Sequence, residues 1–382
     1  MLELMVRNGW RATDKIGDAD LVILNACGLT QYSEECSIHL AKSIQHSKKP
    51  DARLIVCGCL AKINPSRLKE VYDGPMFGSD EDEALGRIFD FPVNGDHPPA
   101  NYLIPYTHGS AGWSSRLRNI SQIMDPYSLM WLPYAKDFVR CAGENNIIGP
   151  NVSYIKVASG CLNNCTYCGV KLSRGQLKSK PVRQIVDELK SGLELGFNDF
   201  ALIGSDLGCY GRDQGGDLVQ MLRELTGIPG KFSIRIRNVH PRFMIEMLPG
   251  LADVFASGRI SFMISAAQSG SNRIIDLMGR GYCIEDYITA VNTLKKSSPT
   301  FRLRTQLMVG FPGETDDEFG ETLALLDRVA FDFVETYGFS PRPGTPAASL
   351  PGRVSPHTIT KRLFHLNKKI LHQLRGRSAQ AA

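Results

Sequence analysis

Short apolar runs alternate with helical patterns along most of the chain, which predicts alternating strands and helices. The first run, Leu21-Val-Ile-Leu24, is continuous, as in a strand buried on both faces of a parallel sheet. A helical pattern then extends to about Ser47, and Pro50 follows as a stop signal. A second strand is predicted over Arg53-Leu-Ile-Val56. Residues 1–95 are therefore predicted to form an open parallel α/β domain.

Residues 96–150 differ in composition from the segments on either side. Proline and glycine recur through this stretch, and it holds two of the three tryptophans of the chain. Such a composition predicts an irregular linker, while the aromatic content argues against simple disorder. Long irregular segments are often functional, so we expect this linker to help cover an active site.

Six strand–helix units are predicted from residue 151 onward. The strands are expected at 154–160, 200–203, 233–237, 260–265, 303–309 and 333–339. The helices are expected at about 181–195, 216–225, 241–248, 271–278, 284–297 and 316–329. Six units with right-handed crossovers predict a partial (β/α)6 barrel over 151–375, with its active site at the C-terminal ends of the strands.

A last helix is predicted at about 355–375, followed by a tail at 376–382. Its apolar stripe is expected to consist of Leu363, Leu366, Ile370 and Leu374. Its basic residues are expected to face outward, as a solvated face, and they are Lys361, Arg362, Lys368, Lys369 and Arg375.

Composition limits the classes of protein that fit. No apolar run approaches the ~20 residues of a membrane helix, and the N-terminus lacks a signal-peptide pattern. Ten cysteines without a secretory signal favour a reducing compartment, the cytoplasm, and metal binding over disulfides. A net charge of +5 permits an anionic partner without requiring one. No membrane partner is expected.

Three cysteines with the spacing Cys-x3-Cys-x2-Cys follow the strand at 154–160. These are Cys161, Cys165 and Cys168, in a loop that lets several sulfurs converge on one centre. A structural zinc site normally takes four protein ligands, and no fourth Cys or His lies near this triplet. A four-iron cluster held by three cysteines would instead keep one iron open. The spacing therefore favours such a cluster.

This loop, with Tyr167 before its last cysteine, resembles the signature of radical S-adenosylmethionine enzymes. Four further stretches resemble the methylthiotransferases among them: Gln268-Ser-Gly-Ser271, Met278-Gly-Arg280, Val309-Gly-Phe-Pro-Gly-Glu-Thr315 and Ser340-Pro-Arg-Pro-Gly-Thr345. The resemblance covers roughly residues 1–375. It implies that the open iron binds S-adenosylmethionine, that cleavage yields a 5′-deoxyadenosyl radical, and that sulfur enters an unactivated C–H bond of tRNA or ribosomal protein.

Cys27 and Cys59 each follow a predicted strand of the N-terminal domain. The carboxyl ends of parallel strands meet at one edge, so the two cysteines are expected to lie close together. The resemblance implies that they are two of the three ligands of a second [4Fe–4S] cluster, which handles sulfur. The third ligand of the family lies upstream of the position where this chain begins, at Met1. The second site is therefore expected to be incomplete.

Two other cysteines are candidate substitutes for that third ligand. Cys36 shares a helical stripe with Leu40 and Ile44, so it is predicted to be a core residue instead. Cys57 is either a ligand or a strand residue that faces a helix.

Residues at predicted strand ends are candidate contacts of S-adenosylmethionine. Tyr167 would pack at the adenine, as the resemblance implies. Asp206 would bind ribose hydroxyls or form an Asx turn. Arg237 would pair with the carboxylate of S-adenosylmethionine through a bidentate fork, or would cap a helix or lie on the surface.

Gln268 and Arg342 complete the set of predicted cofactor-binding residues at the C-terminal ends of the barrel strands. Gln306 marks a departure, because the family usually has an acidic residue at this position before Val-Gly-Phe-Pro-Gly. The change removes a charge and weakens a close assignment to the tRNA enzymes.

Three kinds of substrate fit these motifs: tRNA, a peptide or a small molecule, with an electron donor such as flavodoxin or ferredoxin. The tRNA-modifying members carry a further RNA-binding β-barrel domain, which is expected to be missing after residue 382, so a small molecule or peptide is a rival to tRNA. Cobalamin-dependent radical methylation is an alternative, although neither His39 nor His46 lies in an Asp-x-His-x-x-Gly context. A non-catalytic iron–sulfur or zinc-binding module is the alternative outside enzymes.

Overall fold

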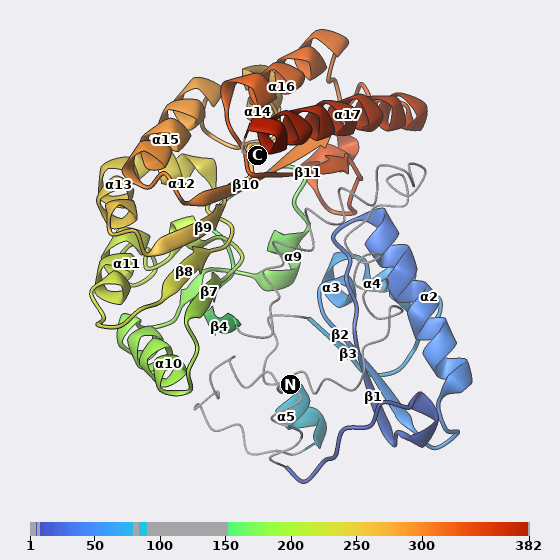
Figure 1. Ribbon diagram of the computed structural model, residues 1–382. Helices are drawn as coiled ribbons and strands as arrows, with labels where there is room; N and C mark the ends of the chain where they lie inside the picture. The colour runs from blue at the N-terminus through green and yellow to red at the C-terminus, as the bar shows by residue number, and fades with distance from the viewer. Residues whose placement is uncertain (1–4, 6–7, 79–83, 90–151, 381–382) are drawn as a thin grey trace. The chain divides into compact units, whose positions relative to one another are not determined.

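A computed structural model describes residues 5, 8–78, 84–89 and 152–380 (Figure 1). The predicted linker at 96–150 lies outside the described residues. The chain divides into two compact units. The described part of the first unit contains residues up to 89 together with Tyr167–Gln176 and Ser340–Ala348, and the second contains 152–166, 177–339 and 349–380. The sequence pattern does not predict that Tyr167–Gln176 and Ser340–Ala348 belong to the first unit.

The first unit contains a small parallel sheet with the order β1-β2-β3. Its strands are β1 (Leu21–Asn25), β2 (Arg53–Cys57) and β3 (Met76–Phe77). Its helices are α2 (Gln31–Ser47), α3 (Leu60–Ile63), α4 (Pro65–Lys69), α5 (Ala84–Phe89) and α9 (Val170–Arg174). Both predicted strands and the predicted helix between them are present. Thr30 and Ser33 form a capping box that starts α2.

The buried face of α2 differs from the predicted one. Ile38, Ala41 and Ile44 are buried, whereas Cys36 is exposed and Leu40 is 47% exposed. The prediction that Cys36 is a core residue is therefore wrong. Ile44 belongs to both stripes that the sequence allows on this helix, and the sheet selects the stripe that contains Ile38 and Ala41.

The second unit contains a six-stranded sheet with the order β11-β10-β9-β8-β7-β4, in which every neighbouring pair is parallel. The strands are β4 (Val152–Lys156), β7 (Asp199–Ile203), β8 (Ser233–Ile236), β9 (Ile260–Ile264), β10 (Arg302–Val309) and β11 (Phe333–Gly338). Strands that follow one another in sequence lie next to one another, and β4 and β11 form the two edges. The predicted open, six-unit parallel barrel is confirmed.

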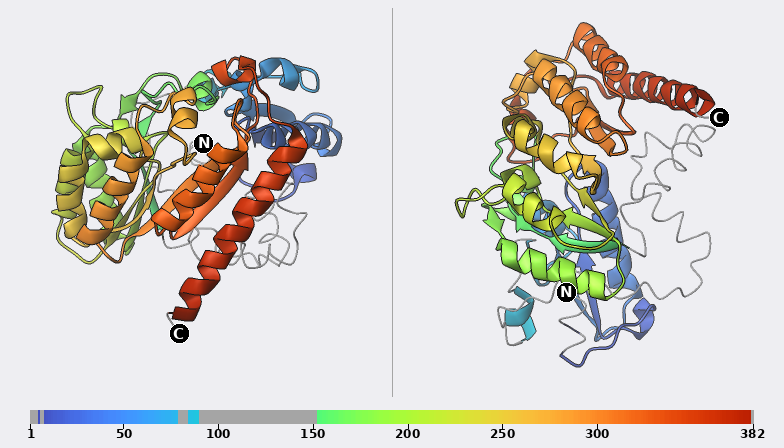
Figure 2. Two further views of the ribbon diagram at one scale, coloured as in Figure 1. Left: turned by 90° about the horizontal axis from the view of Figure 1, so that it is seen from above. Right: turned by 60° about the vertical axis from the view of Figure 1, so that its left-hand side comes forward.

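The helices between the strands lie along the outside of this sheet (Figures 1 and 2). They are α10 (Val182–Glu194), α11 (Leu218–Thr226), α12 (Pro241–Glu246), α13 (Leu248–Ala256), α14 (Asn272–Leu277), α15 (Ile284–Ser297) and α16 (Asp316–Arg328). The sequence missed α13, because Pro249-Gly250 reads as a stop. Proline is tolerated in the first turn of a helix, and Pro249 lies there.

The predicted strand at 154–160 is divided. After β4, a second short strand, β5 (Ala158–Ser159), pairs antiparallel with β6 (Lys178–Ser179). The cysteine loop therefore leaves from β5 and not from the barrel strand itself.

The last helix, α17 (Pro356–Gln380), packs against β11 and α16 (Figure 2). Leu363, Leu366 and Ile370 are buried as predicted. Within the described residues, no helix is both long enough and apolar enough to cross a membrane.

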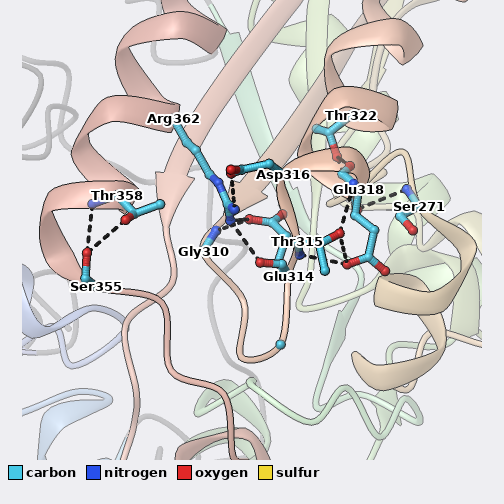
Figure 3. A network of polar contacts seen from close by, with 12 residues as sticks. Ser271, Gly310, Glu314, Thr315, Asp316, Glu318, Thr322, Ser355, Thr358 and Arg362 are labelled. Carbon is cyan, nitrogen blue, oxygen red and sulfur yellow. Dashed lines mark hydrogen bonds and ion pairs between the residues drawn. The ribbon is translucent and has the colours of Figure 1, made fainter.

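Arg362 on α17 is not solvated, and the prediction that it faces outward is wrong. Its guanidinium is buried and donates to Glu314 at 2.6 Å and to Asp316 at 2.7 Å (Figure 3). The same Glu314 carboxylate accepts the backbone N–H of Gly310 at 2.6 Å. Arg362 thus neutralises a buried carboxylate that closes the turn after β10. This partner lies 48 residues away in sequence, so helix periodicity could not reveal it.

Candidate metal centre

The loop that carries Cys161 and Cys165 is fixed to the end of α14. Thr166 donates its backbone N–H to Met278 O at 2.9 Å and its hydroxyl to Leu277 O at 2.8 Å. Gly279 has a φ of +65°, and a Cβ at this position would lie 3.1 Å from Asn164 O. Only glycine combines this backbone conformation with so close an approach. The Met278-Gly-Arg280 stretch therefore supports the cysteine loop directly.

Cys161 is held by neutral hydrogen-bond donors. The backbone N–H of Asn163 lies 3.4 Å from its sulfur, and the side-chain Nδ2 of Asn163 lies 3.3 Å from it. The thiol of buried Cys209 also contacts it, and this hydrogen bond lowers the pKa of Cys161. Donors directed at a sulfur favour its thiolate form, which is the form that binds metal.

Asp206 is fully engaged by the protein. Its carboxylate accepts from Gly208 N–H at 2.9 Å, from His240 N–H at 3.0 Å and from Asn163 Nδ2 at 2.5 Å. The Asx turn is present, because Asp206 caps the short helix η2 (Leu207–Cys209). Burial raises its pKa, and the three donors oppose that rise. The carboxylate thus ties the loop of Cys161 to the start of α12, and ribose binding by Asp206 stays a prediction.

The Asp206 carboxylate also belongs to a group of described residues whose atoms are close enough together to hold a metal ion. An Asp206 oxygen and the sulfurs of Cys161 and Cys209 all lie within 4.8 Å of one another. The backbone O of Asp206 lies 3.1 Å from the Cys209 sulfur and competes with Cys161 for its single thiol hydrogen. The hydrogen bond with Cys161, followed by burial, raises the pKa of Cys209, so it remains a thiol. Cys161 is therefore the thiolate of the pair.

Cys165 is contacted by two nitrogen donors from other elements. Nη1 of Arg280 lies 3.6 Å from its sulfur, and Nε2 of His240 lies 3.7 Å from it. Burial raises the pKa of Cys165, and the charge of Arg280 opposes this effect. Burial, followed by the nearby Arg280 and Arg242, lowers the pKa of His240 to about 2.

The sequence pattern does not single out His240, Asn163 or Cys209 as residues of this site, and Arg280 stands out only as part of the Met278-Gly-Arg280 stretch. One weak signal was available, because His240 directly precedes Pro241 at a predicted strand-to-helix junction. Such a position suits a helix N-cap, and His240 caps α12.

Cys168 and Tyr167 belong to the segment Tyr167–Gln176 of the first unit. Both side chains are half-buried. Their roles as cluster ligand and adenine contact rest on the spacing of the motif.

Gln268 has the features of a ligand-binding residue. Its φ is +69°, a left-handed conformation that a residue other than glycine rarely adopts. Its backbone bridges to β10, donating to Gln306 O and accepting from Met308 N–H, both at 2.8 Å. Its side-chain Oε1 is buried and has no hydrogen-bond partner among the described residues. Strain and an orphaned acceptor are common at functional positions, and cofactor binding by Gln268 stays a prediction.

Arg237 is a half-buried cation without an ion pair among the described residues. Burial and the neighbouring Arg304 lower its pKa. The nearby carboxylate, Glu335, already accepts from Arg304 at 2.8 Å, from Gln306 at 2.7 Å and from the Tyr337 hydroxyl at 3.1 Å. The Nε of Arg237 is buried without a partner. Such a group favours an anionic ligand.

Arg342 lies in the first unit, in the segment Ser340–Ala348. Its buried guanidinium forms an ion pair with Glu34 of α2, which also accepts from Asn64 at 2.9 Å. Its charge is therefore already neutralised, and a cofactor contact by Arg342 stays a prediction.

Cys27 and Cys59 lie at one edge of the small sheet. Ala26 donates its N–H to Cys57 O at 2.7 Å and accepts the Leu60 N–H at 3.1 Å, so the segments that carry Cys27 and Cys59 adjoin. Cys27 is exposed, and Cys59 is buried at the start of α3.

Cys57, the last residue of β2, is buried in an apolar cluster with Ile55 and Phe77. Burial raises its pKa to about 11, so it remains a thiol at neutral pH. It is therefore the strand residue of the two alternatives. In the described part of the chain, no third ligand joins Cys27 and Cys59 to make a group of three.

Comparison with known proteins gives matches over most of the chain. Residues 155–326 match the Radical SAM superfamily, and residues 1–77 match the uncharacterized protein family UPF0004. The threonylcarbamoyladenosine tRNA methylthiotransferase MtaB of Thermotoga maritima is 30% identical over 356 residues, covering 92% of this chain and 74% of that protein. The tRNA-2-methylthio-N(6)-dimethylallyladenosine synthase of Aquifex aeolicus is 30% identical over 381 residues, covering 96% and 79%.

Among solved structures, the radical S-adenosylmethionine methyltransferase TsrM of Kitasatospora setae, with cobalamin and a [4Fe–4S] cluster bound, has a similar fold. The TM-score is 0.57 at 13% identity, covering 90% of this chain and 68% of that one. At this identity the likeness concerns the fold alone.

Proposed function

The chain belongs to the methylthiotransferase family of radical S-adenosylmethionine enzymes, and from this premise we propose that it methylthiolates a C–H carbon of an adenosine in tRNA. Both relatives described above are named for modified adenosines of tRNA, which supports tRNA over the peptide and small-molecule alternatives. Membership of this enzyme family excludes the alternative of a non-catalytic iron–sulfur or zinc-binding module. The cobalamin alternative has only a shared fold in its favour.

We assign Cys161, Cys165 and Cys168 as the ligands of the [4Fe–4S] cluster. The donor set fits, because Cys161 and Cys165 are half-buried in an anchored loop and nitrogen donors point at both sulfurs. When bound, the cluster and S-adenosylmethionine supply an electron and a 5′-deoxyadenosyl radical that abstracts hydrogen from the target carbon. The protein contributes the orientation of the sulfurs and the anchoring of their loop.

Gln268, Arg237 and Tyr167 are proposed to bind S-adenosylmethionine, with unequal support, and Asp206 to act indirectly. Gln268 has an orphaned buried acceptor that suits a hydroxyl or ammonium donor, and Arg237 lacks an anion that a carboxylate would supply. Tyr167 is proposed at the adenine from its place in the motif. Asp206 is proposed to act on the ribose only through the loop geometry that it fixes.

Cys27 and Cys59 are proposed as ligands of the second cluster, which supplies sulfur. Their place at one sheet edge supports this role, and two thiolates alone hold such a cluster weakly. A flavodoxin or ferredoxin in the cytoplasm is the proposed electron donor.

The cysteine loop supports the radical chemistry, the two relatives support tRNA as substrate, and activity on tRNA tests both. The anaerobically reconstituted protein is incubated with dithionite, S-adenosylmethionine and tRNA lacking methylthio groups, and the nucleosides are analysed by mass spectrometry. We expect a methylthioadenosine derivative, which Cys165→Ala abolishes and Cys283→Ala leaves intact. Cys283 is the matched control because it lies at the start of α15, where its thiol donates to Asp286 at 3.0 Å. S-adenosylmethionine cleavage without any tRNA product would contradict the substrate assignment.

A further inference from the structure

Two nitrogen donors converge on the sulfur of Cys165, and the protonation of both is fixed by geometry. The guanidinium of Arg280 has only donors to offer, at 3.6 Å from the sulfur. His240 Nδ1 accepts the backbone N–H of Arg242 at 3.2 Å. A ring nitrogen that accepts a hydrogen bond carries no hydrogen, so the ring is neutral and its hydrogen is on Nε2. That Nε2–H lies 3.7 Å from the Cys165 sulfur and donates to it.

Both donors are held in place by contacts that do not involve the cysteine. Nη2 of Arg280 donates to Ala266 O at 2.6 Å, and its guanidinium lies 5.6 Å from the centre of the Tyr282 ring. The backbone N–H of His240 donates to Asp206 at 3.0 Å, and Pro241 fixes the first turn of the helix that His240 caps. The two donors are therefore preorganised and need no cluster to orient them.

The two cysteines of this unit differ in the charge that they face. The hydrogen bonds to the Cys161 sulfur come from the backbone and side chain of Asn163 and from Cys209, and all of these donors are neutral. Cys165 receives a neutral donor and a cationic one. Charge-assisted hydrogen bonds are roughly twice as strong as neutral ones, so the asymmetry is substantial.

We propose that Arg280 and His240 are positioning residues that raise the reduction potential of the cluster through hydrogen bonds to the Cys165 sulfur. This inference rests on the proposed role of Cys165 as a cluster ligand. Reduction adds negative charge to the cluster and its sulfurs, so donors directed at a ligand sulfur stabilise the reduced state more than the oxidised state. The cationic guanidinium of Arg280 raises the reduction potential more than the neutral imidazole of His240 does.

Redox titration of the reconstituted cluster tests the proposal, with the cluster signal followed by electron paramagnetic resonance. The full chain is used in a Cys27→Ala/Cys59→Ala background, so that only one cluster titrates. Arg280→Met removes both charge and donor, and Arg280→Lys keeps the charge. His240→Asn keeps a capping oxygen for Arg242 N–H but is too short to reach Cys165. Arg212→Gln is the charge-matched control, because Arg212 pairs with Glu246 at the surface.

We expect the midpoint potential to shift to more negative values in Arg280→Met and, by less, in His240→Asn. Arg280→Lys is expected to fall between Arg280→Met and the parent, and Arg212→Gln to match the parent. Iron content per protein is measured for each variant. If Arg280→Met fails to retain iron, the midpoint potentials of Arg280→Lys and His240→Asn are compared with that of the parent protein.

Unchanged potentials in Arg280→Lys and His240→Asn, at parental iron content, would overturn the inference. A shift of the same size in Arg212→Gln would also overturn it, because the effect would then be one of net charge. Failure of the parent protein to bind a cluster through Cys161, Cys165 and Cys168 would instead contradict the proposed function. The two failures are thus separate.

Discussion

Gln306 on β10 lies opposite Glu335 on β11 and donates to its carboxylate at 2.7 Å. The family usually places an acidic residue at position 306, and here the neighbouring strand supplies the carboxylate instead. Glu335 is also ion-paired with Arg304, and its charge only partly opposes the effects of burial and of Arg304, which lower the pKa of Arg237. A negative charge is therefore present beside position 306, supplied by Glu335 on the neighbouring strand. Arg237 lies near this carboxylate without an ion pair among the described residues.

Replacing Arg237 by Met should stabilise the protein and weaken its binding of S-adenosylmethionine. An unpaired, half-buried cation costs free energy, so its removal is expected to raise the free energy of unfolding by about 1 kcal/mol. Denaturant midpoints and equilibrium binding of S-adenosylmethionine measure the two effects. Loss of stability with unchanged binding would indicate a purely structural arginine.

Replacing Gln268 by Leu should weaken binding of S-adenosylmethionine while leaving cluster content unchanged. The variant removes the orphaned acceptor, and one hydrogen bond is worth about 1 kcal/mol, which corresponds to roughly a fivefold rise in Kd. Equilibrium binding and iron analysis check the two expectations. Gln220→Leu on the exposed face of α11 is the matched control. Equal affinities for the Gln268 and Gln220 variants would argue against a cofactor contact.

The barrel could be predicted from the sequence because its signals are local. Each of the six strands is a short run of apolar or alternating residues, and the capping box of Thr315 and Glu318 marks the start of α16. The errors arose where the partner is distant. Arg362 is buried because Glu314 neutralises it, and Cys36 is exposed because the sheet packs on the other stripe of α2.

In the candidate site too, residues that are close in sequence could be predicted and distant ones could not. The three cysteines of the loop are close in sequence, so their spacing alone predicts a metal site. The residues that contact their sulfurs are not local, because Arg280 is 115 residues from Cys165 and His240 is 75. No periodicity connects such positions, and only the parallel order of the strands brings their C-terminal ends to one side of the sheet.

Glu318 should make the stability of the protein sensitive to acid. Its carboxylate accepts from Arg273 and from Thr315, which lowers its pKa to about 2 from an ordinary value of 4.5. A carboxyl group whose pKa is lower in the folded state than in the unfolded state stabilises the fold. This contribution is complete at pH values above 4.5 and is lost as the pH falls toward 2. Glu318→Gln keeps a capping oxygen and removes the charge.

The destabilisation caused by Glu318→Gln is therefore expected to be largest near neutral pH and to shrink below the ordinary carboxyl pKa of 4.5. Urea midpoints of both proteins at about pH 7 and about pH 3 measure this difference. A difference that is the same at both pH values would exclude the charge as its cause.

The N-terminal cysteines should differ in their effect on bound iron. In a variant whose barrel cysteines are replaced by Ala, Cys59→Ala and Cys27→Ala should each remove the residual iron. Cys57→Ala should not, because Cys57 points into the apolar cluster and remains a thiol. Iron analysis and Mössbauer spectroscopy make the comparison. Iron lost only in Cys57→Ala would reassign the site.

The most direct test of the account is the formation of 5′-deoxyadenosine by the reduced, reconstituted protein in the presence of S-adenosylmethionine. The account predicts formation of this product by the parent protein and by Cys283→Ala, and none by the variant in which Cys161, Cys165 and Cys168 are all replaced by Ala. Circular dichroism checks that the triple variant is folded. Cleavage of S-adenosylmethionine by the folded triple variant would contradict the central claim.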